Sequence, residues 1–209
     1  METKFTEQQS LEVITEMINR ARNNVQKGSA NNMIYNGFAV AFVAVANFIL
    51  VHVLPDEYGF YSFNIWWLMV PSTVINHFIK RKINRSAIVK THIDSIISRL
   101  WLGFSISVAF LLISIFGICL VYDNWVAALL ITPDIMIMTG LVEFGMAKIC
   151  RYRPFFWGAV VFWSGSLLCV FTYYVLNRGD LHFLIIAACM IAGFVIPGYQ
   201  LNKSAKKNV

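Results

Sequence analysis

The sequence predicts an all-α, polytopic membrane protein with six transmembrane helices. Of its 209 residues, 58% are apolar and 13% are charged, whereas soluble domains are about 45–50% apolar and about 25% charged. The apolar residues form continuous runs rather than alternating patterns, which favours helices over a barrel as the structure that satisfies its backbone hydrogen bonds in lipid. Nearly all basic residues lie before the first run, in every second connection between runs, or after the last run. These observations predict three hairpins that leave the cytoplasm and return to it.

The first segment, before any apolar run, predicts an amphipathic helix over residues 6–27. Leu11, Ile14 and Ile18 recur at helical spacing on one face, and Gly28 is expected to end the helix. This face is a candidate for binding a cytoplasmic protein. The alternative is a helix that lies along the inner headgroups or against the bundle. The glutamates of this segment are atypical of a signal peptide, so we expect it to be retained.

Six apolar runs follow, and each is expected to cross the membrane. A bilayer core of about 30 Å needs about 20 helical residues. The second run is long enough only if it begins near Tyr58, after Pro55. The chain therefore divides into a cytoplasmic segment 1–32, a transmembrane domain 33–201 and a basic tail 202–209, with spans at 33–54, 58–79, 100–121, 125–147, 155–176 and 181–201.

The distribution of positive charge predicts the orientation. Of the 17 Lys and Arg residues, only Arg178 lies in a loop on the predicted outer side. The others lie in segment 1–32, in 80–99, in 148–154 and in the tail. The positive-inside rule therefore places both termini in the cytoplasm. Because membrane insertion explains the net charge of +6, the bilayer and not a nucleic acid is the expected partner.

The three hairpins share a pattern of small residues. A glycine lies near the inner end of each outgoing span, and a small residue precedes a valine by two positions in each returning span. This pattern predicts a repeated hairpin; the alternative is that hairpins of similar length acquire small residues for helix packing. The residues are Gly37, Gly103 and Gly158 in the outgoing spans, and Ser72, Gly140 and Gly193 in the returning ones.

Asp134 is one of two acidic residues inside the predicted spans. Ionisable groups in a membrane are costly and are therefore candidates for function. Asp134 lies near the bilayer midplane, and no Lys or Arg lies within any span. Two interpretations remain open. Either Asp134 carries a proton or cation in transit, or it is a neutral acid that hydrogen-bonds Thr132, Thr139 or Asn47.

Glu143 is the other acidic residue and lies nearer the inner end of the fourth span. Asn76 and His77 lie at comparable depth in the second span. If these two spans touch, Glu143 and His77 would pair, and the imidazole would titrate near physiological pH. Nine residues separate Asp134 from Glu143, which places them on different helical faces. A continuous proton path through both is therefore not predicted.

The motifs of common enzymes do not occur in the sequence. It contains no H-E-x-x-H, no G-x-S-x-G and no phosphate-binding glycine loop. The four cysteines form no C-x-x-C pair, so neither a zinc site nor a disulfide framework is indicated. We therefore expect a non-enzymatic scaffold or signalling module without a cofactor. The alternative is a small-solute or proton-coupled transporter that uses Asp134, and a homo-oligomer is compatible with either function.

Four short segments carry a resemblance to a known family. They are Glu7–Glu12, Trp67–Pro71, Val89–Asp94 and Ile196–Gly198. The chain resembles, along its whole length, a family of small, uncharacterised bacterial inner-membrane proteins with a cytoplasmic N-terminal helix, six predicted spans and no assigned activity. The resemblance implies a shared architecture and an inner-membrane location. It supplies no catalytic residues, and it includes neither Asp134 nor Glu143.

Overall fold

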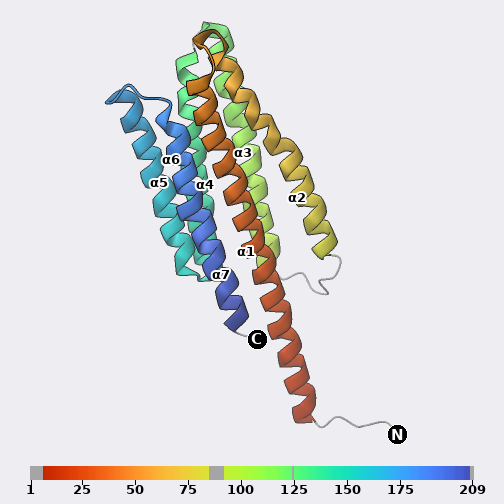
Figure 1. Ribbon diagram of the computed structural model, residues 1–209. Helices are drawn as coiled ribbons and strands as arrows, with labels where there is room; N and C mark the ends of the chain where they lie inside the picture. Colours follow the sequence, from red (N-terminus) through yellow and green to blue (C-terminus); the bar gives the residue numbers. More distant parts are fainter. Residues whose placement is uncertain (1–6, 85–91, 124, 208–209) are drawn as a thin grey trace.

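The computed structural model describes residues 7–84, 92–123 and 125–207, which are almost entirely helical and contain no strand. The predicted all-α class is therefore confirmed. Figure 1 shows a bundle in which successive segments run in opposite directions. In chain order the elements are α1 (Glu7–Val53), the 3₁₀ helix η1 (Asp56–Leu68), α2 (Met69–Asn84), α3 (His92–Tyr122), the 3₁₀ helix η2 (Trp125–Leu130), α4 (Ile131–Cys150), α5 (Arg153–Tyr174), α6 (Leu181–Met190), the π-helical segment η3 (Ile191–Val195) and α7 (Ile196–Lys207).

Within the described ranges, five helical segments are long and apolar enough to cross a membrane. Their outward surfaces support this class of protein. On α3, for example, Phe110 is 67% exposed and Leu120 is 73% exposed. A surface of this kind is costly in water but suits contact with lipid tails. The five segments are Ala30–Val53, Ser95–Tyr122, Trp125–Cys150, Arg153–Tyr174 and Leu181–Lys203.

The predicted second span, 58–79, is not a single α-helix. It begins as the 13-residue 3₁₀ helix η1 and continues as α2, and both elements pack against α1. Runs of 3₁₀ helix longer than a few residues are uncommon. The change to α-helix at Met69 places Pro71 in the first turn of α2, the part of an α-helix in which proline is tolerated.

The prediction that Gly28 ends the first helix is wrong. The helix α1 is 47 residues long and continues through Gly28, and Figure 1 shows its first turns extending beyond the end of α7. A glycine that ends a helix usually takes the left-handed conformation, but no described glycine has a positive φ. The residues after Gly28 again favour a helix, so the helix continues. Glycine in its interior costs about 1 kcal/mol of helix stability relative to alanine. The side chains of Leu11, Ile14 and Ile18 lie outside the described residues.

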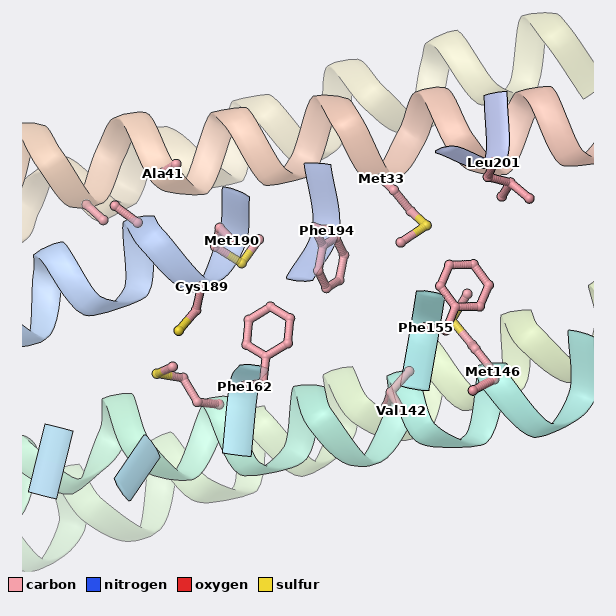
Figure 2. Packing of buried hydrophobic residues seen from close by; sticks show 14 of the residues in the cluster. Met33, Ala41, Val142, Met146, Phe155, Phe162, Cys189, Met190, Phe194 and Leu201 are labelled. Carbon is pink, nitrogen blue, oxygen red and sulfur yellow. The ribbon is translucent and has the colours of Figure 1, made fainter. Parts of the chain in front are cut away.

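Two groups of helices meet at the core. The helix α4 packs chiefly on α5, and α1 packs on α6, η3 and α7. Figure 2 shows Phe162 of α5 facing Phe194 of η3 between these groups; their ring centroids are 5.5 Å apart. Close approach depends on glycines, because a β-carbon on Gly37 would lie 2.6 Å from Val195.

The glycines of the predicted repeat occupy different environments. Gly37 and Gly158 lie against neighbouring helices, whereas a β-carbon on Gly103 would have no heavy atom within 4 Å. The three-hairpin repeat therefore remains a prediction. Figure 1 shows the first turns of α1 and the end of α7 at the same end of the bundle.

Candidate functional site

Glu143 is the most unusual polar residue in the core. It lies in the second half of α4, and its exposed fraction is 0%. Neither of its carboxyl oxygens has a hydrogen-bond partner among the described residues. Buried polar groups are nearly always hydrogen-bonded, so an unpaired carboxyl in a native core indicates a functional role or an additional bound species.

Two glycines make room for the Glu143 carboxyl. Its Oε2 atom occupies the place where a β-carbon on Gly158 would lie, and that β-carbon would be only 2.8 Å from the carbonyl oxygen of Gly193. The acid and the Gly193 carbonyl therefore converge on the α-carbon of Gly158. The Phe162 ring covers Gly193 from the side of α5. Sequence reasoning noted both glycines, but only as members of a repeat.

The Gly193 carbonyl belongs to an irregular turn. In an α-helix its donor would be the N–H four residues later, but that residue is Pro197, which has no N–H. The chain responds locally by changing register: the N–H of Ile196 donates to the carbonyl of Ile191, five residues back. Single π-helical turns of this kind frequently occur at functional sites.

The cationic side chains described on the neighbouring helices lie at the surface. Lys148 on α4, Arg153 on α5 and Arg99 on α3 are all exposed, and the Lys148 ammonium lies 5.5 Å from the centre of the Phe144 ring. No ion pair to Glu143 exists within the described part of the chain. The predicted partner, His77, lies on α2, which packs against α1, and its side chain is outside the described residues. The predicted pairing is thus untested.

Asn76 belongs to a separate polar cluster between α1 and α2. Its amide donates to Asn32 at 2.7 Å and to Asn36 at 3.2 Å. One turn away, the hydroxyls of Tyr35 and Ser72 lie 3.1 Å apart. These contacts join the first two segments of the bundle, so the structure does not place Asn76 beside Glu143.

Asn47, proposed from sequence as a partner of Asp134, is fully buried in α1. Neither atom of its amide has a hydrogen-bond partner among the described residues. Thr139, the other buried candidate, donates to the carbonyl of Ile135 at 2.7 Å. The structure therefore shows neither residue bonded to Asp134.

Asp134 itself is partly buried, in the first turn of α4. A hollow of about 70 Å³ lies nearby and includes Pro133 and His182 in its wall, and a shallow hollow of about 550 Å³ follows the outer face of α1 around Phe38. Asp134 lines neither of them. The predicted transport path through Asp134 gains no support from these two hollows.

A charged cluster joins the end of α1 to the α5–α6 connection. The Arg178 guanidinium donates to both carboxylate oxygens of Asp180, at 2.9 and 2.8 Å, and His52 lies 3.4 Å from the same carboxylate. The hydrogen bonds from Arg178 lower the pKa of Asp180 below its ordinary value. Sequence reasoning missed this contact, for which the Arg178-x-Asp180 spacing was the only local signal.

No protein-family model matches the chain, and neither the curated proteins nor the solved structures include a match. The site must therefore be interpreted from its own chemistry. Across the described ranges, no three His, Cys, Asp or Glu side chains are grouped as metal ligands. What the site offers is one acid and one backbone carbonyl, enclosed by aromatic rings and glycines.

Proposed function

We propose that the protein is a six-span bacterial inner-membrane protein that acts as a non-enzymatic scaffold or signalling module, with both termini in the cytoplasm. Its N-terminal helix would bind a cytoplasmic protein partner. The observation that carries this proposal is that α1 is a single helix of 47 residues. It connects the transmembrane bundle to the cytoplasmic segment without a break.

The length of α1 supports this interpretation. At 1.5 Å per residue the helix is about 70 Å long, more than twice the thickness of a bilayer core of about 30 Å. Its apolar portion begins only at Ala30. More than 20 preceding residues of the same helix would thus project from the membrane, where a partner could reach them.

The positions of charged residues support the orientation and the six spans. Exposed cationic residues lie near one end of four helices: Arg99 near the start of α3, Lys148 near the end of α4, Arg153 at the start of α5 and Lys203 near the end of α7. Figure 1 shows these helix ends on the side of the bundle where α7 ends. At the opposite end, Arg178 is neutralised by Asp180. With η1 and α2 as the sixth crossing, the termini emerge on one side, as the positive-inside rule requires.

Reporter fusions test the topology. Green fluorescent protein fused after residue 207 should fluoresce, and alkaline phosphatase inserted after residue 123 should be active, because the first folds in the cytoplasm and the second in the periplasm. With the positions exchanged, green fluorescent protein after residue 123 should not fluoresce and alkaline phosphatase after residue 207 should be inactive. Active phosphatase after residue 207 would contradict the orientation.

A crosslinking pull-down from detergent-solubilised membranes tests partner binding. Removing residues 1–27 should abolish capture of a cytoplasmic protein, and so should Leu11→Glu, Ile14→Glu and Ile18→Glu together. Gln9→Glu with Asn23→Glu is the matched control, since at 100° per residue it adds charge to the opposite face. Unchanged capture by the truncated protein would refute the proposal, and solute or proton flux in liposomes that Asp134→Asn abolishes would favour transport instead.

A further inference from the structure

We propose that Glu143 and the Gly193 carbonyl form a proton-binding site at the junction of α4, α5 and η3. In this site the carboxyl is protonated and neutral, and its O–H is directed at the Gly193 oxygen. This inference goes beyond a scaffolding function and does not depend on it. It would hold equally for a protein with a different activity.

The first argument concerns charge. A carboxylate with no exposed surface and no counter-charge is strongly unfavourable in a core, and no cationic side chain in the described part of the chain pairs with Glu143. The cationic side chains described on the surrounding elements are exposed: Lys148 on α4, Arg153 on α5, Arg99 on α3 and Lys203 on α7. Of the other titratable groups, Tyr199 on α7 is exposed, Asp134 is half-buried nine residues earlier on α4, and the thiols of Cys169 on α5 and Cys189 on α6 are buried. One bound proton removes the charge.

The second argument concerns space and ligand number. The carboxyl lies against the α-carbon of Gly158, and the Phe162 ring closes the side toward Gly193. The oxygens nearest to this position are those of the acid and of the Gly193 carbonyl. Ca²⁺ and Mg²⁺ need about six oxygen ligands, and the described residues group no three His, Cys, Asp or Glu side chains as metal ligands, so a proton fits this donor set better than a metal ion does.

The third argument concerns the carbonyl. Pro197 deprives the Gly193 oxygen of its α-helical donor, and the π-helical turn leaves this oxygen directed toward the notch at Gly158. A protonated carboxyl would supply a donor at that place. The proton comes from water and returns to water, so binding requires no other reactant.

The site lies beside α1, so its protonation should also affect how η3 packs on α1. The side chain of Val195, two residues after Gly193, lies against Gly37 of α1. Loss of the proton would place a negative charge within this packed junction. We therefore expect the packing of η3 on α1 to depend on occupancy of the site.

Infrared spectroscopy of the full-length protein in dodecyl maltoside, a detergent without carbonyl groups, tests the proposal. The C=O stretch of a protonated carboxyl is separate from the amide and carboxylate bands. At neutral pH in heavy water, the wild-type protein should show this band, and Glu143→Gln should lack it. Asp134→Asn, which removes the other acid of the same helix, should retain the Glu143 band. Glu143→Asp should move the band, which provides a second variant if Glu143→Gln does not fold.

Three outcomes would overturn the proposal. The first is a wild-type spectrum without a protonated carboxyl, and the second is a band that persists in folded Glu143→Gln. The third is loss of the wild-type band when sodium chloride replaces choline chloride at constant pH. That result would assign the site to sodium rather than to a proton.

Discussion

The carboxyl of Glu143 occupies the volume that a β-carbon on Gly158 would fill. The two residues lie on neighbouring antiparallel helices, α4 and α5, which form the most extensive contact in the bundle. The long side chain on one helix therefore fits only because the other helix has none at that level. This steric relationship makes the site unusually easy to probe by substitution.

Gly158→Ala should destabilise the protein, because the new methyl group must displace the carboxyl and approaches the Gly193 oxygen. Overpacking of this kind costs about 1–3 kcal/mol. Thermal unfolding in detergent should show a lower Tm. Gly103→Ala is the matched control: its methyl group would meet no atom within 4 Å, so the better helix propensity of alanine should leave Tm unchanged or raise it. Equal effects of the two substitutions would contradict the predicted fit.

Asn76→Ala should loosen the contact between α1 and α2, because it removes two hydrogen bonds between the helices. Hydrogen bonds between membrane helices contribute about 0.6 kcal/mol each on average, so a loss of about 1 kcal/mol is expected. Tyr35→Phe removes one exposed bond to Ser72 and should cost less. Thermal unfolding of the two variants shows which substitution lowers Tm more. A larger decrease for Tyr35→Phe would contradict the prediction that the Asn76 hydrogen bonds contribute more to this contact.

The Arg178–Asp180 pair should contribute a small, pH-dependent stability. Because Arg178 lowers the pKa of Asp180 in the folded protein, folding favours the ionised carboxylate. The contribution is complete above the ordinary Asp pKa of 3.8 and is lost as the pH falls through the lowered value. Tm should therefore be slightly higher for the wild type than for Asp180→Asn at pH 7 and equal at strongly acidic pH. Asp123→Asn, at an exposed position of the same end, controls for net charge.

Gly28→Pro should break α1 at the point where the bundle ends. Proline removes a helical hydrogen bond and clashes with the preceding turn, at a cost of about 3 kcal/mol or more. Spin labels at the exposed positions Val13 and Phe42 should be about 44 Å apart in a continuous helix. We expect one narrow distance distribution for the wild type and Gly28→Ala, and a shorter or broader one for Gly28→Pro. A broad distribution in the wild type would show that α1 bends at Gly28 without the substitution.

Composition and periodicity predicted the helical class, because an apolar run of about 20 residues has few alternatives in lipid. They failed at Gly28, since a glycine that ends a helix and one that lies within it look alike in sequence. They also missed the 3₁₀ segment before Met69. Its aromatic residues fit either kind of helix, and only the position of Pro71 marks where the α-helix begins.

For the site, the sequence identified Glu143 but not its surroundings. Its burial follows from the packing of α4 on α5 and from the register change at Ile191–Val195, both of which are tertiary properties. Pro197 was visible in the sequence, but its consequence depends on the Gly193 carbonyl facing another helix. The suggested neighbour His77 was chosen by depth in the membrane, and depth does not specify which helices touch.

The fit between Glu143 and Gly158 also constrains the order in which mutations can accumulate. A side chain at position 158 collides with the acid, whereas a shorter residue at position 143 leaves only a void. Mutational routes that lose both residues therefore shorten position 143 first. In lineages that abandon the acid, the glycine should persist, because the Gly193 carbonyl still leaves little room for a β-carbon at position 158.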